Sequence, residues 1–191
     1  MIFIDIETRP NEQLIETYLT NLSAPKNYKD EEKIKEWLEE KKLETRRNLS
    51  LDQDYSEIAC IAIKIDDHET ELTTLEAVGK LIDKDTIVTF NGKTFDLPIM
   101  IKCGIKSKLD MPYRKMKEMT KKWNSLGHID LMELLSFNKD YKSLDQYLQI
   151  YLGIKKTPID FNTCSQEELE NHCKEDVENL YKLYKLFENI I

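Results

Sequence analysis

Runs of apolar residues mark short β-strands in the first half of the chain. The clearest runs cover residues 1–6, 57–65 and 86–90, and a weaker run covers residues 69–75. Residues 66–68 join two of these runs with a sequence typical of a hairpin turn. The pattern predicts a sheet that opens with antiparallel strands.

Helical periodicity dominates the second half of the chain. Helices are predicted around residues 98–103, 131–137, 144–152 and 167–187. The last is the longest, and its apolar residues repeat at helical spacing: Leu169, Cys173, Val177, Leu180, Leu183, Tyr184 and Phe187. A short strand at 128–130 precedes the second helix, which Asp130 is expected to cap. The length and the mixture of elements predict one α/β domain, residues 1–191.

Residues 9–55 form an insertion between the first two strands. Residues 30–47 within it predict one helix with acidic residues first and basic residues last, as the helix dipole favours. Ile34, Trp37 and Leu38 supply its only apolar face. We interpret the insertion as a peripheral addition, with a lid or a partner surface as the open alternatives.

Composition excludes several classes of protein. The chain is 40% hydrophobic and 34% charged, and no apolar run approaches the roughly 20 residues that cross a bilayer. The first residues show no signal-peptide pattern, and the four cysteines occur without a Cys-x-x-Cys pair. These features predict a cytoplasmic protein with reduced thiols, no zinc site and no membrane contact.

The net charge of −8 is unevenly distributed. The segment 102–122 contains eight basic and two acidic residues, a net charge of +6, and the rest of the chain carries −14. A basic strip on an acidic body suits localised contact with phosphate groups, whereas the alternative is a solvated lysine-rich loop. Tyr113 and Trp123 within the segment are candidates for stacking on single-stranded bases.

Two acidic residues interrupt the first predicted strand. Asp5 and Glu7 are two positions apart, so a strand points both side chains to the same face. Burying two carboxylates together costs on the order of several kcal/mol unless a cation compensates. Mg²⁺ and Mn²⁺ favour such oxygen ligands. The pattern predicts either a metal site or an ordinary solvated strand end.

Two later segments supply further candidate ligands. Asp96 follows the turn at Asn91 and Gly92 and lies at the start of a helix, where it could cap the helix or bind a metal. His172 and Asp176 are four residues apart on the last helix and share one helical face. That spacing fits either a surface pair or a second half of the same site.

Together these segments resemble a known set of motifs. Residues 3–8, 91–98 and 172–176 are similar, in sequence and in order, to the three exonuclease motifs of the DEDD superfamily. The chain most resembles predicted 3′–5′ exonucleases related to the proofreading domain of family B DNA polymerases. Further stretches that look like that family are residues 128–136, 143–145, 152–156 and 173–177.

The resemblance implies a ribonuclease-H-like fold, with a central mixed β-sheet flanked by helices, and hydrolysis of phosphodiester bonds from a 3′ end. It implies two divalent cations, Mg²⁺ or Mn²⁺, that stabilise the attacking and the leaving oxygen. The implied metal ligands are Asp5, Glu7, Asp96 and Asp176. The expected substrate contacts are Thr8, Asn91 and Phe95 and, from the basic segment, Lys102, Arg114, Lys115, Lys121 and Lys122.

One position departs from the family pattern. Family members place a tyrosine four residues before the last aspartate, where this chain has His172. The other branch of the superfamily uses a histidine five residues before it, where this chain has Asn171. An imidazole with a pKa near ~6.5 can accept a proton from an attacking water. We expect His172 to be catalytic in this way; the alternative is that it only packs or pairs with Asp176.

The expected partner is single-stranded nucleic acid, with DNA favoured over RNA, and any replication or repair partner would act in trans. An RNA 3′–5′ exonuclease is the nearest alternative, because the sequence does not place contacts to a 2′-hydroxyl. A non-catalytic nucleic-acid-binding module is favoured only by His172. A structural subunit would use the helix at residues 30–47 as its contact surface. Retention of all four carboxylates favours the enzyme.

Overall fold

The computed structural model describes residues 1–137, 140–161 and 163–190, without the side chains of Leu43, Arg46 and Arg47. It contains two compact units. The first unit consists of Met1–Glu7 and Ile58–Ile191, and the second unit consists of Thr8–Glu57. The second unit covers the insertion expected at residues 9–55. That the whole chain is one functional domain stays a prediction.

A five-stranded sheet forms the centre of the first unit, in the order β3-β2-β1-β4-β5. The strands are β1 (Ile2–Pro10), β2 (Ser56–Ile65), β3 (Glu71–Thr73), β4 (Ile87–Thr89) and β5 (His128–Asp130). β2 and β3 are antiparallel and form the expected hairpin, whereas β4 is parallel to both β1 and β5. The sheet is therefore mixed.

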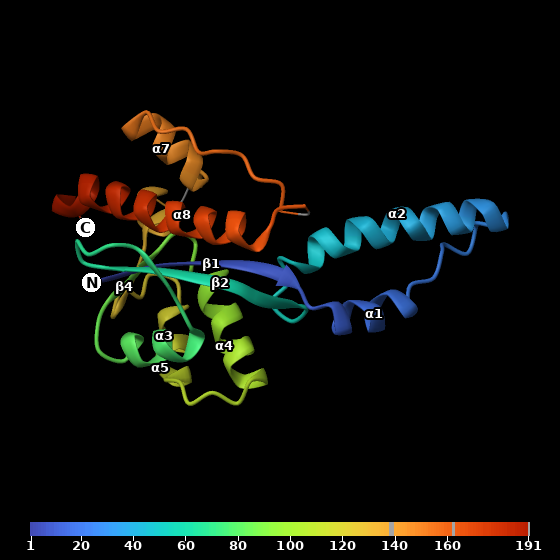
Figure 1. Cartoon of the computed structure of the whole chain (residues 1–191), viewed down its shortest axis with the longest axis horizontal. Helices are drawn as coiled ribbons and strands as arrows, with labels where there is room; N and C mark the ends of the chain where they lie inside the picture. Colours follow the sequence, from blue (N-terminus) through green and yellow to red (C-terminus); the bar gives the residue numbers. More distant parts are fainter. Residues whose placement is uncertain (138–139, 162, 191) are drawn as a thin grey trace. The chain divides into compact units, whose positions relative to one another are not determined.

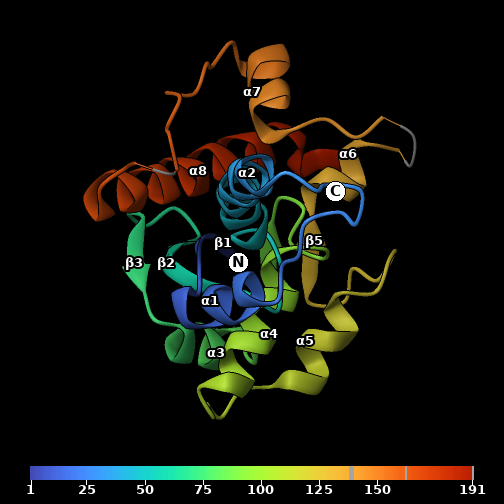
Figure 2. The ribbon, with the colours of Figure 1, turned by 90° about the vertical axis from the view of Figure 1, so that its right-hand side faces the viewer.

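Helices cover both faces of this sheet (Figures 1 and 2). One layer contains α3 (Leu75–Ile82), α4 (Asp96–Lys106) and α5 (Tyr113–Met119), and the other contains α6 (Leu131–Leu135), α7 (Leu144–Leu152) and α8 (Gln166–Phe187). β1 contributes to both cores, because Ile2, Ile4 and Ile6 pack with the first layer and Phe3 packs with the second. The expected central mixed sheet flanked by helices is confirmed.

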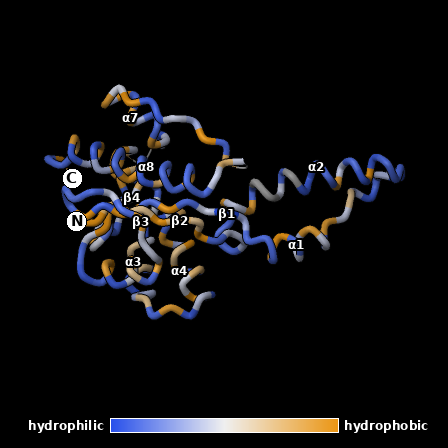
Figure 3. The backbone as a smooth tube through the Cα atoms, viewed as in Figure 1, coloured by the Kyte–Doolittle hydropathy of each residue, from blue (hydrophilic) through white to orange (hydrophobic). Residues whose placement is uncertain are grey.

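The second unit contains α1 (Glu12–Thr20) and α2 (Glu31–Leu49). Asn11 caps α1 by accepting the Leu14 N–H at 3.2 Å, and Asp30 caps α2 by accepting the Glu32 N–H at 3.0 Å. Figure 3 shows hydrophobic residues gathered on the central strands, whereas α2 is largely hydrophilic. The helix expected at residues 30–47 is confirmed, starting one residue later and ending two residues later than expected.

The sequence pattern does not predict three of the helices: α1, α3 and α5. In α3 an interior glycine, Gly79, lowers the intrinsic helix propensity. A Cβ at this position would lie 3.0 Å from Met111 Cγ, so a larger residue would require the Met111 side chain to shift. The strand expected at 69–75 shortens to β3, because Thr74 caps α3 by accepting the Ala77 N–H at 3.3 Å. Among the described residues, no helix has both the length and the hydropathy that crossing a membrane requires.

Candidate active site

The face of β1 that is turned towards α8 carries the first two carboxylates. Asp5 and Glu7 share this face with Phe3, whose ring meets Tyr181 of α8 edge-on at 5.1 Å between centroids. Cys173 Sγ of α8 lies 3.4 Å from the Asp5 main-chain oxygen and 3.6 Å from its carboxylate Oδ2. The alternation of the strand therefore directs both carboxylates to the last helix rather than to a solvated strand end.

Helix α8 brings His172 and Asp176 to the same place. Ser165 and Glu168 form a capping box at the start of the helix. His172 Nε2 lies 3.8 Å from Glu7 Oε1 and 3.8 Å from Asp176 Oδ2. The side chains of His172 and Asp176 are only 10% and 12% exposed, so the interpretation as a surface pair is wrong. One ligand atom from each of the three residues lies within 4.8 Å of the others.

Asp96 is the first residue of α4 and is 3% exposed. The helix therefore starts two residues before the expected boundary at 98, and its N-cap position is held by Phe95 without a side-chain cap. The backbone of Ile6 in β1 lowers the pKa of the Asp96 carboxyl, and the Asp96 charge raises the pKa of Asp5. The third carboxylate thus lies beside the first two, and the alternative that Asp96 is the N-cap is wrong.

Burial and mutual repulsion raise the pKa of these carboxyl groups. Burial raises the pKa of Glu7 to about 8, with the Asp176 charge as the next cause, and it raises the pKa of Asp96 to about 7. Burial also raises the pKa of Asp5 well above its usual value, and the neighbouring Asp96, Asp176 and Glu7 charges raise it further. The group does not carry its full negative charge at neutral pH without additional positive charge.

Lys156 supplies one positive charge to the site. Its Nζ lies 2.5 Å from Oδ1 and 2.6 Å from Oδ2 of Asp176. Its charge lowers the pKa of Asp5 and of Glu7, although burial outweighs it at both. Lys156 lies in the stretch 152–156 that resembles the family, but the sequence analysis assigns it no role in the site. Two features of the sequence could have pointed to it. The four acidic residues need a cation, and Gly153, with a φ of 65°, ends α7 shortly before this lysine.

The donor set fits a divalent cation of the Mg²⁺ or Mn²⁺ class. Glu7, His172 and Asp176 can each offer a ligand atom, and the Asp5 and Asp96 carboxyls lie beside them. Asp176 Oδ1 is buried and accepts no hydrogen bond from the described residues, although the Lys156 ammonium is close to it. A buried oxygen with an unused lone pair, among raised-pKa carboxyls, is suited to metal ligation.

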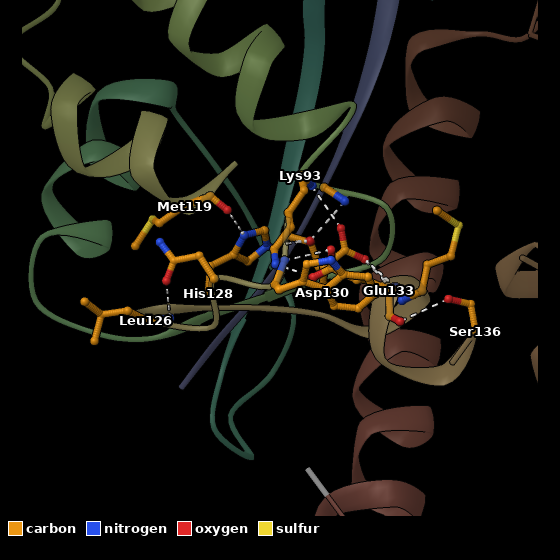
Figure 4. Close-up of polar contacts among 12 residues, drawn as sticks. Lys93, Met119, Leu126, His128, Asp130, Glu133 and Ser136 are labelled. Carbon is orange, nitrogen blue, oxygen red and sulfur yellow. Dashed lines mark hydrogen bonds and ion pairs between the residues drawn. The ribbon is translucent and has the colours of Figure 1, made fainter. Parts of the chain in front are cut away.

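A buried polar network holds the turn before α4 (Figure 4). Asp130 Oδ1 accepts the N–H of Asn91 and Oδ2 accepts the N–H of Lys93, both at 3.0 Å. The same carboxylate caps α6, so the expected capping role is confirmed. The Lys93 ammonium pairs with Glu133 of α6. Asp130 therefore fixes the turn that delivers Asp96 to the site.

His128 anchors the same turn from β5. It donates Nδ1–H to the Met119 carbonyl at 3.2 Å and accepts the Thr89 hydroxyl at Nε2 at 2.8 Å. Thr89 in turn accepts the Gly92 N–H at 3.1 Å. Burial lowers the pKa of His128, which favours the neutral imidazole, and because the Met119 carbonyl can only accept, the ring proton is assigned to Nδ1. A Cβ at Gly92 would lie 2.1 Å from Thr89 Oγ1, which explains the glycine.

Asp130→Ala is expected to lower the free energy of unfolding by about 2–3 kcal/mol, because buried backbone N–H groups and a helix cap lose their acceptor. Urea unfolding measures the change. Asp130→Asn keeps one side-chain oxygen and is expected to lose less. A change below roughly 0.5 kcal/mol for the alanine variant would show that the network is not needed for stability.

Three expected substrate contacts have partners within the chain. The Thr8 hydroxyl donates to the Ser50 carbonyl at 2.7 Å, and Asn91 Oδ1 accepts the Thr94 hydroxyl at 2.5 Å. Phe95 is partly buried and packs against the core of the α3–α5 layer. Contact of these residues with substrate stays a prediction.

The basic segment lies on and after α4 and α5, in the layer opposite α8 (Figures 1 and 2). Lys115 Nζ donates to the Asp83 carbonyl at 2.9 Å, and Lys121 pairs with Glu118. Lys102 is half-buried and Arg114 is exposed. The structure does not place this segment beside the carboxylates, so its contact with phosphate stays a prediction.

The two aromatic residues of the segment differ. The partly buried Tyr113 ring packs against the core and its hydroxyl donates to the Leu109 carbonyl at 2.7 Å, so less of this ring is available for stacking on bases. Trp123 is 55% exposed, and Lys122 Nζ lies 5.0 Å from its ring centroid. Trp123 therefore remains the stacking candidate.

A pocket of about 470 Å³ opens beside His172. Its lining is Thr157, Pro158, Ile159, Asp160, Thr163, Cys164, Glu168, Asn171, His172 and Glu175. This lining contains three acidic side chains and no lysine or arginine, so its charge does not favour phosphate. Phe161, in the same segment, meets the His172 ring edge-on at 5.5 Å between centroids and is 52% exposed. The sequence pattern does not predict this aromatic contact.

Comparison with known proteins identifies a family that the chain matches. Residues 48–190, more than half of the chain, match the family described as predicted 3′–5′ exonuclease related to the exonuclease domain of PolB. The matched region includes Asp96, Lys156, His172 and Asp176 and begins after β1. No curated protein sequence matches the chain.

The fold is also similar to that of a solved structure, the family B DNA polymerase from the hyperthermophilic archaeon Pyrobaculum calidifontis. The TM-score is 0.60 at 16% sequence identity, over 98% of this chain and 24% of the polymerase chain. This chain thus spans about a quarter of the polymerase length. The similarity confirms the expected ribonuclease-H-like α/β fold.

Proposed function

Because the chain belongs to the family of predicted 3′–5′ exonucleases related to the exonuclease domain of PolB, we propose that it is a metal-dependent 3′–5′ exonuclease acting on single-stranded DNA. The observation that carries the proposal is the convergence of Glu7, His172 and Asp176 within 4.8 Å, beside two further buried carboxyls. The proposed setting is the cytoplasm, with any replication or repair partner acting in trans.

Two divalent cations, Mg²⁺ or Mn²⁺, held by Asp5, Glu7, Asp96 and Asp176, would supply the positive charge that stabilises the attacking and leaving oxygens. Strand β1 and helices α4 and α8 hold these carboxyl groups in place before substrate binds. His172 Nε2 faces Glu7 and Asp176 at 3.8 Å, where it can accept the proton of the attacking water. Burial lowers the pKa of His172, which favours the neutral, proton-accepting imidazole at neutral pH.

Degradation of a 5′-labelled single-stranded DNA oligonucleotide tests the proposal. With Mg²⁺ or Mn²⁺ we expect a ladder of shortened 5′-labelled products, and we expect no ladder with EDTA or with Asp5→Ala. RNA of the same sequence, run in parallel, tests the choice of sugar. An intact DNA oligonucleotide with degraded RNA would move the substrate to RNA. Both strands intact under every metal condition would contradict the enzyme.

His172→Phe is expected to lower kcat by about 10²-fold, because it removes the proton acceptor. As pH falls through the lowered pKa of His172, the imidazole becomes protonated and the wild-type rate should fall. His172→Tyr should therefore lose this acidic limb of the pH–rate profile. An unchanged limb in the tyrosine variant would show that another group, not His172, accepts the proton.

Contact between the basic segment and phosphate groups is also part of the proposal. We expect the KM for single-stranded DNA to rise with added salt, because bound cations are released from DNA where lysine and arginine neutralise it. Replacing both Arg114 and Lys122 by alanine should raise KM and flatten its dependence on salt. Leu126→Ala, a change at an exposed neutral residue nearby, is the matched control. A wild-type KM that does not change with salt would show that the basic segment does not contact the phosphate groups of the substrate.

A further inference from the structure

Trp123, at the end of the basic segment, combines an exposed ring with an unusual backbone conformation. It is 55% exposed although Lys122 Nζ lies 5.0 Å from the ring centroid. Its φ of 64° lies in the left-handed region, which is unfavourable for a bulky residue. Such a conformation persists only where neighbouring groups hold it. An exposed indole that is held in place is suited to contact with an aromatic ligand.

Glu133 of α6 holds Trp123. Its Oε1 accepts the Trp123 N–H at 3.1 Å, and its Oε2 pairs with the Lys93 ammonium (Figure 4). The side chains of Lys93 and Glu133 are only 5% and 14% exposed. The Lys93 N–H in turn donates to Asp130, which fixes the turn before α4. One buried carboxylate therefore connects Trp123 to the turn that leads to Asp96.

The register of the strands places this turn at the same edge of the sheet as the carboxylates. β4 and β5 are parallel, and their last residues lie opposite each other. β1 is parallel to β4 with Phe3 opposite Val88, so Asp5 is level with Phe90, just before the turn. The start of α6 directly follows β5 and lies at this edge too. Trp123, which is hydrogen-bonded to α6, is therefore tied to the edge that carries the proposed site.

We infer that Trp123 is a stacking platform for the single strand that leads to the carboxylates, and that Glu133 is the residue that positions it. The inference rests on the proposed function and adds to it a source of preference for single strands. An indole ring accepts the face of an unpaired base, whereas the bases of a duplex are already stacked on their neighbours. The Lys122 ammonium beside the ring can meet a phosphate of the same strand. The platform thus holds the substrate on the 5′ side of the bond that is cut.

Loss of the platform should weaken binding of the strand without changing the chemical step. We expect Trp123→Leu to raise the KM for a single-stranded oligonucleotide about tenfold with kcat unchanged, because stacking of one base is lost. The preference for single-stranded over blunt-ended duplex DNA should fall by the same factor. The p-nitrophenyl ester of thymidine 5′-monophosphate carries only the base at the cleavage site. Trp123→Leu should cleave this ester at the wild-type rate, which a misfolded variant would not.

Fluorescence tests the contact directly, because the chain contains only two tryptophans, Trp37 and Trp123. Trp37 lies on α2 in the other compact unit, so in Trp37→Phe protein the emission comes from Trp123 alone. The probe is a dT oligonucleotide in Mg²⁺, with phosphorothioate linkages at its 3′ end that resist cleavage. Its titration should quench the emission as a thymine stacks on the ring. If Trp37→Phe does not fold, the difference in quenching between the wild type and Trp123→Phe measures the same contact.

Glu133→Met tests the positioning role in the same background. It removes the acceptor of the Trp123 N–H, so the Kd from quenching should rise about fivefold, because only a fraction of the molecules then hold the ring in place. If this variant does not fold, Lys93→Met with Glu133→Met replaces the whole buried pair by apolar side chains and should give the same result. Glu178→Met removes the partner of another buried lysine, Lys64, and is the matched control that should keep the Kd.

Quenching that Glu133→Met weakens and Glu178→Met retains supports the inference. Absence of quenching while the unmodified oligonucleotide is degraded overturns the platform and leaves the exonuclease proposal standing. An unchanged Kd in folded Glu133→Met overturns its positioning role. If the wild type cuts neither the oligonucleotide nor the ester, the proposed function itself is wrong.

Discussion

Asp176→Asn is expected to lower the rate of 3′-end degradation by roughly 10³-fold or more, equivalent to about 4 kcal/mol of transition-state stabilisation. The reason is that Asp176 interacts with residues of both α8 and β1. Its Oδ2 lies 3.8 Å from His172 Nε2, and its charge raises the pKa of Asp5 and of Glu7. The amide has the same shape but one fewer ligand oxygen and no charge. The measurement is kcat and KM on 5′-labelled single-stranded DNA at saturating Mn²⁺.

A matched control separates this effect from a general loss of charge on α8. Glu167→Gln removes one negative charge from an exposed position in the first turn of the same helix and should keep the wild-type rate. Circular dichroism establishes that both variants are folded. If folded Asp176→Asn kept more than about a tenth of the wild-type kcat, the proposed cluster would not be where the reaction occurs.

The metal-free protein is expected to become less stable as pH rises from about 5 to about 8.5, by a total on the order of 4 kcal/mol. Burial raises the pKa of Glu7 from 4.5 to about 8, so between these values the folded protein binds a proton that the unfolded chain has released. The stability is therefore complete below the unfolded pKa and is lost as pH rises through the folded pKa. Asp96, with its pKa raised by burial to about 7, acts in the same direction.

Urea unfolding in EDTA at several pH values measures this loss. Glu7→Gln removes one of the titrating groups and should flatten the profile, whereas Glu16→Gln, at an exposed position of α1, should leave it unchanged. Mg²⁺ added at pH 8 should restore stability to the wild type, because a ligand that binds only the folded state stabilises it. A wild-type stability that stays level or rises over this range would mean that the carboxyls are not held protonated by burial.

Much of the fold follows from local sequence patterns. The alternating apolar residues around Asp5 and Glu7 predict a strand with both acids on one face, and the long apolar series of α8 predicts its boundaries to within one residue. Motif order alone indicates the family. The helices that the sequence pattern does not predict are short, and α3 carries an interior glycine over which the Met111 side chain packs closely.

The sequence by itself determined the class of fold, the family and the identity of the acidic residues, because strand and helix periodicity and short motifs are local properties of the chain. Only the tertiary structure decided how these residues are held and neutralised. Lys156 reaches Asp176 across 20 residues, and Asp130 holds the Asn91–Lys93 turn across 37 and 39 residues. Such contacts depend on where elements pack, and no local period of the sequence specifies them.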